Sequence, residues 1–268
     1  MHPTLFKTII AGREIEVVSY TFFTGIAALL VVALGTITAS RRGLGAAKSA
    51  ACLVAGSVFT LIGGRVIHWL TNPKSFYDNH TLFTLSAENF SIYAGLFIGV
   101  PATIVVARIV KVNAWRLADA VTPALALAAA SAKVGCFCAG CCYGKPTALP
   151  WSISVAAGSN AHGSQLLSGE IGFLDSPLPV HPVQLYEAIA ALAGFFVAVW
   201  ILRRGLAEGS AFLWFMAFFS MFRLFNRMFI YPLPNFIAPQ WLFGVVYSIV
   251  AVGCVWVAVR RRTTYSNK

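Results

Sequence analysis

The chain is poor in charge, above all in negative charge. Charged residues make up 11% of its 268 residues, and only nine of them are Asp or Glu. A soluble domain usually has about 25% charged residues, so this chain has too few to cover a water-facing surface. Hydrophobic residues make up 58%, and the mean hydropathy is +0.76. The composition predicts an integral membrane protein and excludes an ordinary soluble enzyme.

The sequence also lacks a single basic patch, although its net charge is +11. Its Lys and Arg residues come in short groups that follow apolar runs, namely Arg41-Arg42 with Lys48, Arg108 with Lys111 and Arg116, Arg203-Arg204, and Arg260-Arg261-Arg262. This pattern is typical of cytoplasmic loop ends and not of a nucleic-acid footprint. We therefore expect no nucleic-acid partner.

Seven apolar runs are long enough to be membrane spans, at roughly 19–39, 51–70, 90–109, 117–137, 185–202, 211–230 and 241–259. The basic groups all follow odd-numbered runs, which places those ends in the cytoplasm. The sequence thus predicts an all-α, polytopic membrane protein with its N-terminus outside and its C-terminus in the cytoplasm. We expect residues 1–268 to form one membrane domain with an outer loop at about 139–182.

Four basic residues fall inside these runs: Arg65, Lys133, Arg223 and Arg227. Each costs about 2.5–3.5 kcal/mol at the bilayer centre, and the acids available nearby are Glu187 and Asp119. A bound anionic lipid headgroup would balance the excess positive charge. The alternative is that these side chains lie near the interfaces and extend to water.

A polar heptad opens the fifth run: His181-Pro182-Val183-Gln184-Leu185-Tyr186-Glu187. His181 and Tyr186 could act as donors or acid-base groups, Gln184 can donate and accept, and Glu187 can orient a base or pair with an arginine. The alternative is an interfacial belt that anchors the helix end.

Four of the six cysteines lie close together, at Cys136, Cys138, Cys141 and Cys142. They could form a structural disulfide or pack plainly, one could be a reactive thiol near Lys133, or they could bind a soft metal. We favour the disulfide or packing, because this spacing is not that of usual zinc sites, and we expect no metal or cofactor.

The heptad resembles the His-Pro-x-Gln-Leu-Tyr-Glu signature of the prolipoprotein diacylglyceryl transferase family. Further resemblances follow in the same order along the chain: Ser19-Tyr20 for a Trp-Tyr pair, Gly63-Gly64-Arg65, Asp119 with Pro123, Gly135-Cys136-Phe137 with Gly140, Tyr143-Gly144-Lys145-Pro146-Thr147, and Phe222-Arg223. The resemblance runs from Tyr20 to about Arg262.

The resemblance implies a transferase that moves diacylglyceryl from phosphatidylglycerol to the lipobox cysteine of a prolipoprotein and releases glycerol 1-phosphate. It implies catalytic roles for Tyr93, Lys133, Arg223 and Glu187. It implies substrate-binding roles for Tyr20, Arg65, Gly144, His181, Gln184 and Tyr186. Its partners would be phosphatidylglycerol, a prolipoprotein signal peptide or another acceptor, and the membrane.

Several positions depart from the family pattern. Tyr93 stands where the family has a histidine often proposed as the base, and a phenol with a pKa near 10 is a poor base. Lys133 replaces an arginine, and a lysine cannot form the bidentate hydrogen bonds that a guanidinium makes to phosphate. Cys136 and Cys141 replace an asparagine and an acid, while Phe219 and Arg227 replace a tyrosine and a glutamate.

Three functions therefore remain open. The chain could be a lipoprotein diacylglyceryl transferase, a related transferase that uses the same donor with a different acceptor, or a non-catalytic membrane protein that binds anionic lipid. Few acids and no inverted repeat argue against a transporter. We favour the first function.

Overall fold

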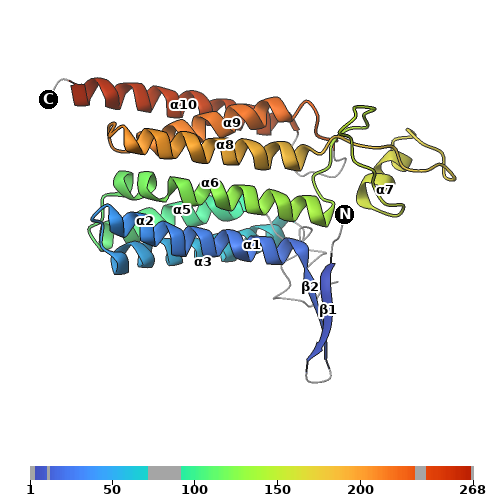
Figure 1. Ribbon diagram of the computed structural model, residues 1–268, viewed down its shortest axis with the longest axis horizontal. Coiled ribbons are helices and arrows are strands. Elements are labelled where there is room, and N and C mark those ends of the chain that lie inside the picture. The colour runs from blue at the N-terminus through green and yellow to red at the C-terminus, as the bar shows by residue number, and fades with distance from the viewer. Residues whose placement is uncertain (1–3, 11–12, 72–91, 233–239, 267–268) are drawn as a thin grey trace.

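The computed structural model describes residues 4–10, 13–71, 92–232 and 240–266. Long helices run side by side, with α6 between one group of helices from the N-terminal half and another from the C-terminal half (Figure 1). The helices are α1 Ser19–Leu29, α2 Gly35–Arg41, α3 Ala46–Thr71, α5 Ile92–Ile109, α6 Ala114–Ala139, α7 Asn160–Leu167, α8 Val183–Arg203, α9 Ser210–Asn226 and α10 Gln240–Ser266. The π-helical segment η1, Leu30–Leu34, joins α1 to α2.

Five helical stretches of the described residues are long and apolar enough to cross a membrane. They are Ser19–Arg41, Ala46–Leu70, Ala114–Ala139, Val183–Arg203 and Trp241–Arg262. These agree with five of the seven runs expected from the sequence. The other two expected runs correspond to shorter apolar helices, Gly95–Ile109 and Ser210–Asn226. The fold is therefore that of a mostly helical, multi-pass membrane protein.

Glycines set the close packing of α3 against α5. A Cβ on Gly99 would lie 2.7 Å from the carbonyl oxygen of Gly56, and one on Gly95 would lie 2.3 Å from that of Thr60. Small residues at such positions let two helix backbones approach within the membrane, where packing and not the hydrophobic effect drives association. α6 instead contacts α1 on one side and α8 on the other, so it joins the two groups of helices.

The predicted cytoplasmic loop ends lie at one end of the bundle. The Arg42 side chain donates to the Leu202 carbonyl, and Arg116 donates to the Arg42 carbonyl. Arg261 donates to the Glu208 carbonyl at 2.9 Å. The basic groups that follow different apolar runs thus meet in space, as the charge pattern predicts.

The opposite end carries elements that the all-α expectation did not include. Strands β1, Thr4–Ile10, and β2, Arg13–Val18, pair antiparallel, with Ile10 opposite Arg13 (Figure 1). Both runs are rich in β-branched residues and are separated by Ala11 and Gly12, which is a hairpin signal. The hairpin adds two short strands to a structure that is otherwise helical, so the structure remains consistent with the predicted all-α class.

The long loop before α8 is ordered and has a small core of its own. It contains α7, and the buried residues Tyr143, Val155, Ala161 and Val180 pack there with Tyr231. Buried Gln165 donates to the Leu178 carbonyl and accepts from its amide. The loop therefore forms a folded cap over the end of the bundle where the heptad lies.

The sequence suggested that Asp119 could pair with the basic residues inside the membrane, but the structure gives it other partners. Its carboxylate accepts from the backbone amides of Gly209 at 2.7 Å and Phe212 at 3.0 Å. The first turn of a helix leaves amides without partners and has a positive dipole end, so a carboxylate there is stabilising. Asp119 thus caps the start of α9.

Candidate functional site

Glu187 of α8 joins two cations from neighbouring helices. Its Oε2 lies 2.5 Å from Lys133 Nζ of α6 and 3.5 Å from Arg223 Nη1 of α9. The Glu187 side chain is 3% exposed, and each cation is 14% exposed. Three residues far apart in sequence therefore meet in one buried cluster, which we call the charged triad. With two cations and one carboxylate, the triad has a net charge of +1.

The second oxygen of Glu187 is held by an amide. Asn226 Nδ2 donates to Glu187 Oε1 and to the Val183 carbonyl, both at 3.1 Å. Asn226 is 1% exposed, and it follows Arg223 by three residues on α9. It fixes the carboxylate so that Oε2 faces the two cations. The sequence reasoning missed Asn226, although a polar residue one turn from Arg223 in an apolar helix was a usable signal.

Gln184 connects the start of α8 to the end of α6. Its side chain is 1% exposed, and its Nε2 donates to the Cys141 carbonyl at 2.7 Å. Its Oε1 is buried without a hydrogen-bond partner among the residues that the structure describes. Gln184 lies one turn before Glu187, so the heptad uses one face of α8 for both buried contacts.

The heptad's remaining polar residues lie at the rim. Trp151 Nε1 donates to the Tyr186 hydroxyl at 2.8 Å, and that hydroxyl lies 3.3 Å from His181 Nδ1. Because Tyr186 accepts from Trp151, its own proton is free to go to His181. Burial lowers the pKa of His181, which keeps its imidazole neutral near pH 7. The rim therefore offers a neutral histidine in a hydrogen-bonded chain.

Gly144 is required by a close backbone approach. Gly144 forms an isolated antiparallel β-bridge with Ile230, and Lys145 N donates to the Phe229 carbonyl at 2.7 Å. A Cβ on Gly144 would lie 2.5 Å from the His181 carbonyl oxygen. No side chain fits there without moving backbone, so Gly144 positions the heptad against the chain that leaves α9.

Three other predicted site residues lie on α1, α3 and α5. Tyr20 is 8% exposed in the first turn of α1, within electrostatic reach of Lys133 and the cysteines. Arg65 is buried on α3 with its guanidinium 5.3 Å from the Trp69 ring centre. Tyr93 lies in the first turn of α5, and its side chain falls outside the described residues. The catalytic and substrate-binding roles assigned from the sequence, including those of Arg65 and Tyr93, stay predictions.

The aromatic surroundings of the arginines differ from one another. Arg223 lies over the ring of Tyr247 at 5.1 Å, and Arg227 lies over Phe243 at 5.6 Å, both on α10. Phe219 stacks on Phe215. Cation–π contacts hold a guanidinium in place without neutralising it. Arg223 therefore keeps its charge in a position fixed by α8 and α10.

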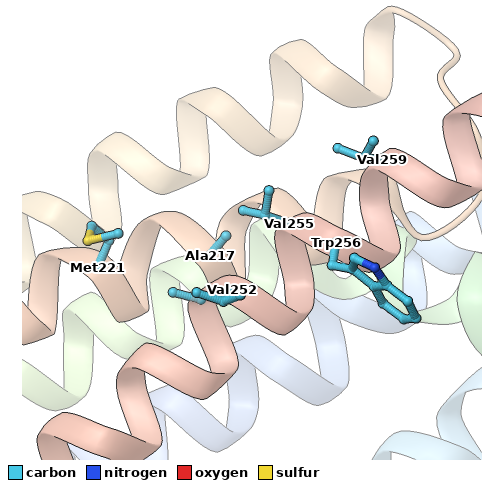
Figure 2. A pocket seen from close by; sticks show the side chains of 7 residues that line it. Ala217, Met221, Val252, Val255, Trp256 and Val259 are labelled. Atoms are coloured by element: carbon cyan, nitrogen blue, oxygen red, sulfur yellow. The ribbon is translucent and has the colours of Figure 1, made fainter.

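An apolar groove lies between α9 and α10. Its volume is about 400 Å³, and its lining residues are Ala217, Met221, Ala251, Val252, Val255, Trp256 and Val259 (Figure 2). Met221 and most of the α10 residues are exposed, so the groove opens to the side of the bundle. It continues the helix face of Tyr247 in steps of four residues.

Comparison with known proteins gives a consistent result. The family model described as prolipoprotein diacylglyceryl transferase matches residues 7–263. A phosphatidylglycerol–prolipoprotein diacylglyceryl transferase from Clostridium tetani is 24% identical over 84% of this chain and 83% of its own length. A protein of the same name from Geobacter sulfurreducens is 30% identical over 72% of this chain and 70% of its own length. One from Clostridium perfringens, numbered 2, is 25% identical over 79% and 78%.

Proposed function

The chain belongs to the prolipoprotein diacylglyceryl transferase family, and from this premise we propose that it transfers diacylglyceryl from phosphatidylglycerol to the thiol of a prolipoprotein's lipobox cysteine. The new bond is a thioether between the thiol sulfur and the glyceryl carbon. The glyceryl C–O bond breaks, and its electron pair leaves with glycerol 1-phosphate. The thiol proton goes to a base.

The convergence of Lys133 and Arg223 on one oxygen atom of Glu187 carries this proposal. Two cations that reach one carboxylate oxygen can also reach one phosphate oxygen of a lipid headgroup. Fixed cations aimed at the leaving phosphate stabilise the negative charge that develops as the C–O bond breaks. In a low-dielectric site such charges act more strongly than in water.

The groove of Figure 2 supports a lipid donor at this place. From Tyr247, which stacks on Arg223, to Val259 at the far end of the groove, α10 rises about 18 Å. We assign the groove to one acyl chain of the donor, with the phosphate at Arg223. Lipid enters from the side, because the groove opens laterally.

The topology belongs to the same proposal. We propose seven spans in one membrane domain, with the hairpin, the cap and the heptad outside and the basic ends in the cytoplasm of a bacterial inner membrane. The cap, which includes the rim at Trp151 and Tyr186, then faces the compartment where a secreted preprotein presents its cysteine. The signal peptide is the proposed acceptor, and phosphatidylglycerol is the donor.

Tyr93 and the neutral His181 are the two candidates that we propose for the base. A phenol must be strongly perturbed to take a thiol proton near pH 7, whereas a neutral imidazole needs no such shift. Tyr93→His restores the residue type that the family resemblance implies, and we expect it to keep or raise the transfer rate. Loss of transfer in Tyr93→His, with lipid binding intact, would assign Tyr93 a different role.

The test is transfer by the purified protein. Mass spectrometry after incubation with labelled phosphatidylglycerol and a lipobox peptide should detect a diacylglyceryl thioether and glycerol 1-phosphate. Arg223→Ala should lose this activity, whereas Arg204→Ala, an exposed arginine stacked on Trp200, should retain it. Glycerol 1-phosphate without modified peptide would indicate another acceptor. Lipid binding with neither product would refute a transferase.

A further inference from the structure

Three of the four clustered cysteines converge at the end of α6. The Sγ atoms of Cys136, Cys141 and Cys142 all lie within 4.8 Å of one another. Cys136 is buried in the last turn of the helix, Cys141 is half-buried, and Cys142 is exposed. Cys138, from the same stretch, does not belong to this group. The three sulfur atoms therefore meet because of the path of the backbone, and not merely because cysteines are frequent in this stretch.

The backbone path at this turn is specific. Gly140 ends α6 in the left-handed conformation with φ 73°, and Cys141 N donates to the Cys136 carbonyl at 3.2 Å. This bond is that of a Schellman motif, which folds the chain back over the helix end. Cys142 also has a positive φ, 55°. A left-handed non-glycine residue is uncommon and persists where its surroundings hold it, so the third thiol is held toward the other two at some conformational cost.

We propose that Cys136, Cys141 and Cys142 bind one soft metal ion, Zn²⁺ or Cu⁺, through their thiolates. Zinc–sulfur bonds are about 2.3 Å long, so three sulfurs on one ion lie about 3.8–4.0 Å apart. The observed separations need only a small rotation of the side chains to reach this geometry. Thiolates select soft d¹⁰ ions over Mg²⁺ or Ca²⁺.

The charges around the cluster suit this ligand set. Each thiol gives up its proton on binding, so three thiolates with Zn²⁺ carry one net negative charge and with Cu⁺ carry two. The positive charges of Lys133 and Arg223 act on Cys142. The charged triad, with its one net positive charge, therefore offsets much of the charge of the occupied site.

A disulfide competes for the same thiols and is the main alternative. Neighbouring Cα atoms across a trans peptide lie 3.8 Å apart, below the usual 4.4 Å minimum for a disulfide, so Cys141 does not pair readily with Cys142. A bond from Cys136 to either of them would leave the third thiol alone. The outer compartment is oxidising, so the redox state must be measured.

A bound ion would tie three elements together. Cys136 belongs to α6, whereas Cys141 and Cys142 begin the cap loop. Gln184 of α8 donates to the Cys141 carbonyl, one turn from Glu187. The ion would thus hold the loop that leads into Gly144 against the part of α8 that carries Gln184 and Glu187. This binding does not depend on the proposed transferase function.

The experiment is metal binding by the full-length protein in detergent, reduced and stripped of metal. Zn²⁺ and Cu⁺ are each titrated against a chromophoric chelator. We expect one ion per chain, and X-ray absorption of the loaded protein should show at least three sulfur neighbours at about 2.3 Å. Cys136→Ser, Cys141→Ser and Cys142→Ser should each weaken binding about 100-fold or more, since even supporting groups cost 10–100-fold.

The matched control is Cys138→Ser, which should bind the ion as the wild type does. Cooperative thermal unfolding of each variant shows whether it is folded, and the X-ray absorption spectrum of the wild type tests the site without any variant. Micromolar or weaker binding of both ions would overturn the proposal. So would fewer than three sulfur neighbours, an equal loss in Cys138→Ser, or a disulfide between two of the three cysteines in protein isolated without reductant.

Discussion

Replacing Glu187 with Gln removes one charge and little else. The new side chain has nearly the same shape, and its carbonyl oxygen can still accept from Asn226. Lys133 and Arg223 then face each other without the carboxylate that both contact. The variant therefore isolates the charge of the triad from its packing.

The expected cost follows from the geometry. Both cations lie on one oxygen, so their nitrogens are at most about 6 Å apart, and an effective dielectric of about 20 gives a repulsion of about 3 kcal/mol. Removal of one member of a buried ion pair costs about 3–5 kcal/mol in other proteins, which agrees. For a chain of this size, about 3 kcal/mol lowers Tm by roughly 6–12 °C.

The assay is thermal unfolding in detergent, with and without phosphatidylglycerol. Glu208→Gln is the matched control, because Glu208 pairs with Arg116 at 3.7 Å with both side chains 48% exposed. Such exposed pairs contribute about 0–1 kcal/mol. Phosphatidylglycerol should raise the Tm of Glu187→Gln more than that of the wild type, since its net negative headgroup replaces the charge of the lost carboxylate, whereas phosphatidylethanolamine, whose ammonium group cancels its phosphate charge, should not. Equal Tm values for the two variants would refute a buried charged triad.

Three further outcomes are expected. Gly144→Ala should destabilise the protein and abolish transfer, because its Cβ would lie 2.5 Å from the His181 carbonyl, whereas Gly163→Ala, with open space around it, should be neutral in the same melts. Lys133→Arg should keep lipid binding and raise transfer severalfold, since a guanidinium binds phosphate with two hydrogen bonds; an unchanged rate would show that one donor suffices. Stability should fall as pH drops below about 6.5, because the unfolded chain protonates His181 while burial lowers its pKa in the fold; His181→Gln should flatten this part of the pH profile.

The membrane helices could be predicted because a helix that crosses the hydrocarbon needs a long run of mostly apolar residues. The runs near 19–39 and 185–202 contain few polar residues, and the helices there are long enough to span. α9 is shorter than the sequence suggested, at 17 residues. The predicted sixth run extended to residue 230, but α9 ends at Asn226 because the chain there pairs with Gly144. A local apolar pattern cannot show such a pairing across 86 positions.

The sequence predicts that buried charges meet in the charged triad, but not which residues pair. A costly Glu187 and costly cations in apolar runs indicate that they meet, because hydrocarbon penalises each of them alone. The partner choice was not predictable, since Asp119 was an equally good acid by sequence. The fold decides, because Asp119 faces the first turn of α9 and Glu187 faces its last turn. The role of Asn226 depended on that same helix pairing.

The carboxylate at the centre of the triad has two opposing effects. It holds Lys133 and Arg223 in place when no lipid is bound, and it competes with the donor phosphate for both cations. A substrate that binds must therefore weaken at least one of these two ion pairs. The longer contact, 3.5 Å to Arg223, is the one that yields at least cost, and Tyr247 keeps that guanidinium oriented while it turns. This division predicts that Lys133 maintains the fold and Arg223 makes the larger contribution to transition-state charge.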